Sequence, residues 1–224
     1  GDLQVELILW LLTIKEKYNK ISRYMNNDFK IFDLFPTPVY TVYISKDKDL
    51  DINDFEFLDN HDRSVDTYVL NNLKYYNLKQ EILNHINNFS YQLGYDCKDY
   101  KITQSWVNIK PKSNPHPPHS HSNSLISGVF YPSNNLDNLP PIKFHQSITN
   151  SLLPKYLPIK DFPNLNYLKS VEFKVKPNLL ILFPSYLIHS VSPNPNNQPK
   201  YSLAFNSVPL KGLGSEHDLN ELKF

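Results

Sequence analysis

The stretch Pro115-His116-Pro117-Pro118-His119-Ser120-His121 is the one around which the sequence is organised. Residues two apart on an extended chain point to the same side, so we expect His119 and His121 to face one way. Proline has a fixed φ and no N–H group, which excludes a helix or a central strand here. The pattern therefore predicts an extended segment that presents two imidazoles to one point, with a solvated Pro/His loop as the alternative.

A third histidine lies in a distant stretch, Phe183-Pro184-Ser185-Tyr186-Leu187-Ile188-His189-Ser190-Val191. His189 follows an apolar run and precedes extended chain, so it is the natural partner of the first two. Neutral imidazole suits iron, zinc or copper. We expect His119, His121 and His189 to hold one metal ion. Cys97 is the single cysteine, which leaves thiolate metal sites without ligands and excludes an intramolecular disulfide.

The composition indicates one globular domain with additional segments at its two ends. The chain has 224 residues, of which 40% are hydrophobic and 13% aromatic, enough for one sizeable core. Met25 is the only methionine and resembles a natural start. We therefore separate residues 1–24, an N-terminal helical extension that is either native or not, from a single jelly-roll domain over 25–210 and a C-terminal tail over 211–224.

The net charge and the hydropathy of the chain limit the classes of partner that we expect. A net charge of +1 gives no argument for nucleic acid or an anionic membrane as partner. The apolar run from Leu7 to Leu12 is far too short to span a bilayer, and it lacks the basic leader of a signal peptide. We expect a small-molecule or peptidyl substrate, a cytoplasmic location in a bacterium or a phage-infected host cell, and either a monomer or a homodimer.

Short β-branched and aromatic runs separated by Pro and Asn turns predict antiparallel strands. These runs are 39–44, 102–109, 124–131, 142–144, 171–175, 179–183 and 201–205. In the second run Trp106 and Asn108 share one face, and we expect Trp106 in the core. Many short strands with one covering helix favour a mainly β sandwich or jelly roll.

The covering helix is predicted over 73–93, where apolar residues recur at helical spacing. Its buried stripe is expected to comprise Ile82, Leu83, Ile86 and Phe89, with His85 exposed on the polar side.

Two long segments lack periodicity. Lys46 to Asp66 is charged, and its carboxylates are most simply solvated loop residues. Gln146 to Leu168 contains several prolines and lies between strands, and a segment of this length is typically either a lid over a substrate site or disordered. His116 and His145 are expected either to line the entrance of such a site or to be ordinary solvated histidines.

Several motifs occur in order along the chain. They are Leu34-Phe35-Pro36-Thr37-Pro38-Val39-Tyr40, Trp106-Val107-Asn108, His119-Ser120-His121, Ser127-Gly128-Val129-Phe130-Tyr131, Leu182-Phe183-Pro184-Ser185 with His189-Ser190-Val191, and Lys200-Tyr201-Ser202-Leu203-Ala204-Phe205-Asn206. Their order resembles the 2-oxoglutarate- and iron(II)-dependent oxygenases of marine phages and bacteria, distant relatives of the prolyl hydroxylases. The resemblance implies a double-stranded β-helix, which is a jelly-roll, cupin-like barrel with flanking helices, and it implies Fe(II) and 2-oxoglutarate as cofactors.

The resemblance also implies which residues hold the metal. The familiar ligand set of these oxygenases is two histidines and one carboxylate, in the order His-x-Asp/Glu…His. In this sequence His121 stands where the carboxylate is expected. The ion would then have three neutral ligands, a set that also suits zinc.

A cosubstrate site follows from the same resemblance. Lys200 lies eleven residues after His189, where the fold places a cation for the far carboxylate of 2-oxoglutarate. Ser202 shares a strand face with Lys200 and is expected to complete the clamp; the alternative is a surface lysine. Asn108 and Tyr131 are expected to bind cosubstrate or substrate, or to make buried structural hydrogen bonds.

From the metal ligands and the cosubstrate site we predict an enzyme that hydroxylates an unactivated C–H bond of an amino acid, peptide or small metabolite. The reaction would release succinate and CO2. No catalytic side chain is expected beyond the metal ligands. Two alternatives stay open: a three-histidine cupin-type dioxygenase that does not use 2-oxoglutarate, and a non-catalytic metal-binding jelly-roll protein.

Overall fold

The computed structural model of the protein describes residues 36–45, 50–58, 62–95, 97, 99–135, 139–146 and 170–223. The chain divides into two compact units, Gly1–Pro36 and Thr37–Phe224. The predicted extension over 1–24 lies outside the described residues, and so does nearly all of the predicted lid segment. In the part that is described, no helix is long and apolar enough to cross a membrane.

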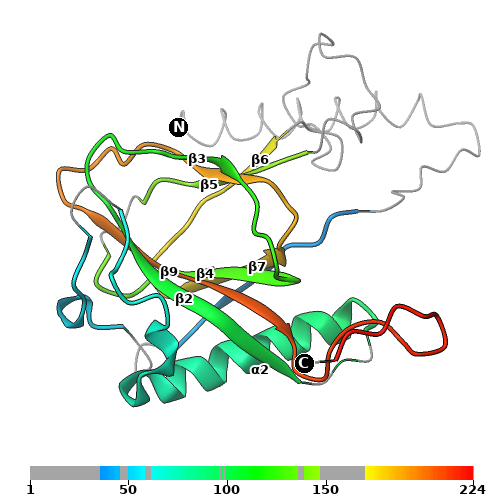
Figure 1. Cartoon of the computed structure of the whole chain (residues 1–224). Coiled ribbons are helices and arrows are strands. Elements are labelled where there is room, and N and C mark those ends of the chain that lie inside the picture. Colours follow the sequence, from blue (N-terminus) through cyan, green and yellow to red (C-terminus); the bar gives the residue numbers. More distant parts are fainter. Residues whose placement is uncertain are drawn as a thin grey trace, which may run out of the picture. The chain divides into compact units, whose positions relative to one another are not determined.

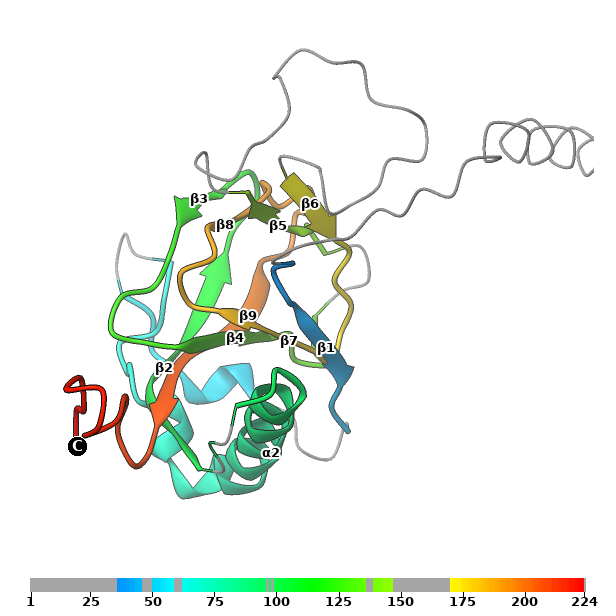
Figure 2. The same cartoon turned by 90° about the vertical axis from the view of Figure 1, so that its right-hand side faces the viewer.

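The second unit contains two antiparallel sheets that face each other (Figures 1 and 2). The larger sheet has the order β1 (Tyr40–Tyr43), β7 (Leu179–Pro184), β4 (Ile126–Phe130), β9 (Lys200–Pro209) and β2 (Tyr100–Lys110). The smaller sheet has the order β3 (His116–His119), β8 (His189–Val191), β5 (Ile142–His145) and β6 (Ser170–Phe173). The predicted mainly β jelly roll is confirmed, although no hydrogen-bonded pair among the described strands closes the two sheets into one barrel.

Helix α2 (Tyr76–Gln92) covers the outer face of the larger sheet (Figure 1). Its buried residues are Leu78, Ile82, Ile86, Phe89 and Ser90, which recur at the spacing of one helical face. Short 3-10 helices precede it at Ile52–Asp54, Val69–Asn71 and Leu73–Tyr75.

The predicted polar side of the helix needs correction. His85 is half-buried, because its ring lies against Tyr40 of β1, with the Tyr40 Oη 3.0 Å from the His85 Nδ1. Leu83 is only half-buried, although it packs against the same core. Tyr40 of β1 contacts both His85 and Phe89, so the covered face of the helix extends beyond the one that spacing alone predicts.

Strand β7 is buried along its whole length and separates two hydrophobic clusters. Leu180 and Leu182 pack with the helix on one face. Ile181 and Phe183 pack on the other face, between the sheets, with Phe144 of β5. A strand covered on both faces has a continuous apolar sequence, and this explains the uninterrupted run in β7.

Gly128 is a residue of β4, which lies between β7 and β9, and it pairs with Leu182 of β7 and Phe205 of β9. A Cβ atom at this position would lie 2.3 Å from the Cζ of Phe205 and 2.7 Å from a Cδ of Leu182. Glycine is required here because the Phe205 ring occupies the space that any side chain would need.

Strand β3 is the edge strand of the smaller sheet and contains Pro117 and Pro118. At an edge, the missing N–H groups cost no ladder hydrogen bond. The register shifts between His116 and His119, after which His119 pairs directly with His189 of β8. The prediction that this stretch is extended but not a central strand is confirmed, and the pairing brings two distant histidines together.

The register between β2 and β9 places further polar residues opposite each other. Paired positions are Asn108 with Ser202 and Lys110 with Lys200. Residues two apart share a face, so these four side chains belong to one surface of the larger sheet, and all of them line the space between the sheets.

Candidate metal centre and cosubstrate pocket

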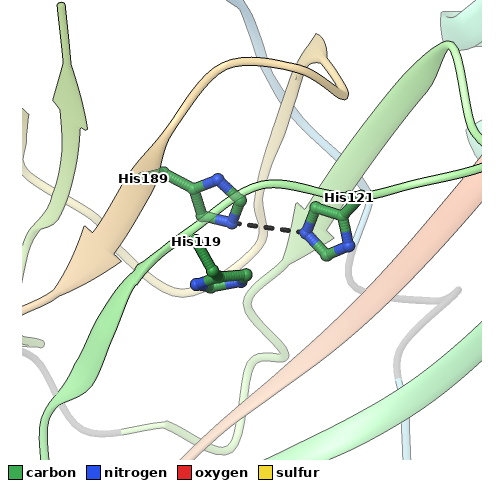
Figure 3. Close-up of side chains that lie close together, drawn as sticks. All are labelled: His119, His121 and His189. Atoms are coloured by element: carbon green, nitrogen blue, oxygen red, sulfur yellow. Dashed lines mark hydrogen bonds between the residues drawn. The ribbon is translucent and has the colours of Figure 1, made fainter. Parts of the chain in front are cut away.

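Three histidine rings from the smaller sheet converge between the sheets (Figure 3). His119 ends β3, His121 follows it two residues later, and His189 begins β8. Their candidate ligand nitrogens all lie within 4.8 Å of one another, and the Nε2 atoms of His121 and His189 are 3.4 Å apart. The structure thus brings together the three residues that the sequence assigns to one metal ion.

Backbone carbonyl groups orient two of these rings. The Nδ1 of His189 lies 3.0 Å from the carbonyl oxygen of Leu187, and the Nδ1 of His119 lies 2.9 Å from that of Pro117. A carbonyl oxygen only accepts, so each Nδ1 carries the proton and donates it. The Nε2 lone pair of each ring is therefore available to a metal, as in many protein metal sites.

Burial keeps two of the three imidazoles, those of His121 and His189, unprotonated. Burial lowers the pKa of His189 to about 3, with a further contribution from the neighbouring rings. Burial also lowers the pKa of His121 to about 4, and His119 adds to the shift. At pH 7 both imidazoles are unprotonated, which is the form that binds a metal ion.

The geometry fits a single first-row metal ion. Metal–nitrogen bonds of about 2.0–2.1 Å place two ligand nitrogens about 3.0–3.4 Å apart. The Nε2 atoms of His121 and His189 are 3.4 Å apart and all three ligand nitrogens lie within 4.8 Å of one another, so a small inward movement of the rings would complete the site. Because the three nitrogens lie on one side, the other coordination positions of an octahedral ion would remain open for exogenous ligands.

A chain of hydroxyl groups supports the backbone at His121. The backbone N–H of His121 donates to the carbonyl oxygen of Ser185 at 2.9 Å. The Ser185 Oγ lies 2.8 Å from the Oγ of Ser124 and 2.7 Å from the Oγ of Ser127, which in turn donates to the Oδ1 of Asn206 at 2.9 Å. These contacts connect the end of β7 to β4 and β9. They thereby hold Ser185, and with it the backbone of the ligand His121, in place.

We expect Ser185→Ala to weaken metal binding about tenfold, since removal of groups that orient ligands typically costs about 10–100-fold in affinity. The free energy of unfolding should fall by about 1–3 kcal/mol, because the buried partners of Ser185 lose a hydrogen bond. Ser170→Ala, at the far edge of the smaller sheet, is the matched control. Metal titration and denaturant unfolding would measure both effects, and an unchanged metal affinity beside a lowered stability would contradict the positioning role.

Lys200 is buried next to the histidines, in an inner cavity of about 40 Å³ that both sheets line. Only 3% of the side chain is exposed. Its Nζ lies 3.4 Å from the carbonyl oxygen of Pro140 and 5.0 Å from the ring centroid of Tyr131. Burial lowers its pKa to about 7, with a smaller contribution from Lys110.

Lys200 takes part in none of the ion pairs found among the described residues. A buried cation without a carboxylate partner is costly unless a ligand supplies the negative charge. The cavity is thus suited to an anionic group that enters beside the histidines.

The other predicted cosubstrate residues line the same cavity. Ser202 and Tyr131 are buried, and burial raises the pKa of the Tyr131 hydroxyl far above its usual value. Asn108 is half-buried, and its Oδ1 accepts a hydrogen bond of 3.2 Å from the Nε1 of Trp106. Trp106 is not a core residue as predicted: it is half-buried, lines the cavity, and its ring centroid lies 6.0 Å from that of His121.

The two predicted entrance histidines differ in position. His116 stacks on His119 with ring centroids 4.3 Å apart, lines the cavity, and has a pKa lowered to about 4, first by burial and then by His119. His145 lines neither this cavity nor the cleft outside it. Its Nε2 lies 2.8 Å from the Oγ of Ser190, on the smaller sheet.

Outside the histidines lies an open cleft of about 710 Å³ that the sequence did not predict. Its walls include Lys110, whose Nζ pairs with the Oδ2 of Asp62 at 2.7 Å, and Asn114, which donates to the same oxygen at 2.6 Å. Arg63 also lines it. Asp62 is therefore not merely a solvated loop carboxylate. Lys110 had a signal in the sequence, because it follows Trp106 and Asn108 on the same strand face.

The comparisons with known proteins agree with this geometry. Residues 104–206, which include the three histidines and Lys200, match the family model described as "Putative 2OG-Fe(II) oxygenase". No curated protein matches the sequence.

One solved structure, HygX, supports the fold, and two others are less similar. HygX from Streptomyces hygroscopicus, with nickel, 2-oxoglutarate and hygromycin B bound, is 8% identical and has a TM-score of 0.51, over 78% of this chain and 84% of its own. A 2OG-Fe(II) oxygenase family oxidoreductase from Burkholderia pseudomallei is 13% identical, with a TM-score of 0.40 over 62% of this chain and 54% of its own. A prolyl-4-hydroxylase from Pseudomonas putida is 14% identical, with a TM-score of 0.38 over 59% of this chain and 63% of its own.

The chain thus spans less than two thirds of the length of the Burkholderia and Pseudomonas proteins. The family match nevertheless covers the segment that carries the three histidines and Lys200. Residues 104–206 thus match the 2OG-Fe(II) oxygenase family model, and the fold of the chain is similar to that of HygX, which was solved with nickel and 2-oxoglutarate bound.

Proposed function

We propose that this protein hydroxylates an unactivated C–H bond of an amino acid, a peptide or a small metabolite. In the balanced reaction, R–H, O2 and 2-oxoglutarate give R–OH, succinate and CO2. One oxygen atom of O2 enters the new hydroxyl group, and the other enters the carboxylate of succinate. The observation that carries the proposal is the buried Lys200, which has no carboxylate partner among the described residues and shares one cavity with three histidines.

Each residue has a separate role in this proposal. His119, His121 and His189 hold iron(II), which together with 2-oxoglutarate and O2 supplies the oxidising power for C–H cleavage. Lys200 binds the far carboxylate of 2-oxoglutarate, and the hydroxyl of Ser202, on the same strand face, assists it. Both groups act by binding and orientation.

Tyr131 and Asn108 complete the pocket. The Tyr131 ring lies under the Lys200 ammonium group and keeps water from its stem. Asn108 lines the boundary between the inner cavity and the open cleft, and the hydrogen bond from Trp106 fixes its amide. No side chain need act as a general acid or base in this scheme.

The proposal is tested by adding iron(II) and then 2-oxoglutarate to the protein without oxygen. We expect a visible charge-transfer band that requires both additions. Admitting air should then release succinate, and product analysis with the substrate should show one added oxygen atom. A protein that gives neither the band nor succinate is not a 2-oxoglutarate oxygenase, and a product without added oxygen would assign it another oxidation.

A further inference from the structure

Most of the residues that line the cleft outside the histidines have polar or charged side chains. Small-molecule sites are usually lined mainly by apolar side chains, with a few polar groups. Among the described residues that line this cleft, the apolar side chains are those of Trp106, Pro115 and Pro117, and none is aliphatic apart from proline. A hydrophobic substrate would cover the remaining polar groups without replacing their hydrogen bonds, at a cost in free energy. The cleft therefore suits a hydrophilic substrate.

The net charge of the site indicates which kind of hydrophilic substrate it would bind. Across the inner cavity and the cleft, the described residues supply three cations, Arg63, Lys110 and Lys200, and one carboxylate, Asp62. The charges of iron(II) and of 2-oxoglutarate cancel, so the loaded site keeps two net positive charges. One of these arises because His121 stands where other oxygenases have a carboxylate ligand. A cleft of one sign of charge attracts a ligand of the opposite sign.

Arg63 is the cation that remains for a substrate. Lys110 is neutralised by Asp62, and Lys200 is buried in the inner cavity. The Nη1 of Arg63 donates to the carbonyl oxygen of Ser64 at 3.3 Å, and its other donors remain for a ligand at the exposed wall of the cleft. None of the ion pairs found among the described residues includes Arg63.

The backbone of Arg63 is held firmly although its side chain is exposed. Arg63 forms an antiparallel bridge with Asn108, and the N–H of Ser64 donates to the carbonyl oxygen of Val107 at 2.7 Å. The backbone from which the guanidinium group extends is thus attached to strand β2, whose residues Trp106 and Asn108 line the same cleft. The chain uses arginine at only Arg23 and Arg63 and lysine at its 21 other cationic positions. Arginine binds a carboxylate or phosphate through two parallel hydrogen bonds, which lysine cannot do.

We propose that the substrate carries a carboxylate or phosphate group that Arg63 binds in the open cleft, with the reacting carbon directed to the histidines. This inference rests on the proposed oxygenase function and adds a substrate class to it.

The test uses matched probes on the full chain loaded with iron(II) and 2-oxoglutarate in the absence of oxygen. One arm compares N-acetylated amino acids with their amides, and the other compares sugar phosphates with the parent sugars. Probe binding is measured as a change in the charge-transfer band, and turnover as succinate released under air. The variants are Arg63→Gln, which removes the charge, and Arg63→Lys, which keeps it. Lys176→Gln removes an exposed cation outside both cavities and is the control.

We expect anionic probes of one arm to bind at least about tenfold more tightly than their neutral partners. Arg63→Gln should abolish this preference, Arg63→Lys should retain part of it, and Lys176→Gln should leave it intact. The arm that responds identifies the group as carboxylate or phosphate. The inference would be overturned if charged and neutral probes bound equally well, or if no anionic probe bound at all. It would also be overturned if Arg63→Gln weakened the binding of charged and neutral probes by the same factor. The band before probe addition tests the oxygenase function separately.

Discussion

His189→Ala is expected to abolish iron binding at micromolar metal and, with it, all 2-oxoglutarate turnover. His189 is the most buried of the three ligands, and its Nε2 is directed to the cluster by the hydrogen bond from Nδ1 to Leu187. Loss of an orienting partner alone typically weakens metal binding about 10–100-fold, so loss of the ligand itself should cost more. Metal analysis after gel filtration and the anaerobic charge-transfer band would measure the effect.

Two further variants separate ligation from folding. His121→Asp replaces one ligand by another and recreates the common set of two histidines and a carboxylate, so it should still bind iron. His145→Ala removes a half-buried histidine of the same sheet that lines neither cavity, and it should leave the band unchanged. If His189→Ala folds, binds iron normally and still forms the band, the three-histidine site is wrong.

Lys200→Met is expected to raise the dissociation constant of 2-oxoglutarate about a hundredfold, which corresponds to about 2.7 kcal/mol. The substitution keeps the apolar stem against Tyr131 and removes only the charge that is buried beside the histidines. Iron binding without 2-oxoglutarate should be unchanged, because no ligand is altered. Lys176→Gln is again the control, since it removes an exposed lysine. Titration of the charge-transfer band with 2-oxoglutarate measures the constant.

The same lysine predicts a pH dependence. Its pKa in the empty pocket is lowered to about 7, and binding of a carboxylate favours the charged form and raises that pKa. The carboxylate thus binds with full affinity below about pH 7, and affinity falls as pH rises above it. Lys200→Met should lose this dependence. An unchanged dissociation constant in the variant would show that Lys200 does not bind the carboxylate of 2-oxoglutarate.

The strands and the histidine pair follow from local sequence, which explains why they could be predicted. Alternation with a period of two residues sets which side chains share a strand face, whatever the strand packs against. His119 and His121, and likewise Lys200 and Ser202, were therefore assigned to common faces before their partners were known. Asn178 adopts a positive φ of 67° in the turn before β7, as the Pro-Asn pair predicts.

Burial and long-range pairing could not be predicted in this way. Trp106 was expected in the core, but strand β2 lies at the edge of the larger sheet and the Trp106 ring lines the cavity. His85 was expected on the surface, but Tyr40 of another strand covers it. The spacing of residues along the chain predicts which side chains lie on the same face. Which other elements cover that face is determined by the tertiary packing.

The sequence by itself determined the antiparallel β architecture and the strand faces that Lys200 shares with Ser202 and His119 with His121, because each depends on residue type and short spacing. Tertiary structure alone decided that Lys200 is buried in the same cavity as the histidines. It also joined Asp62 to Lys110, 48 residues away, and placed Arg63 at the mouth of the site. The physical reason is that a charged residue acquires its function from the partner it meets, and that partner is selected by how the sheets and loops pack.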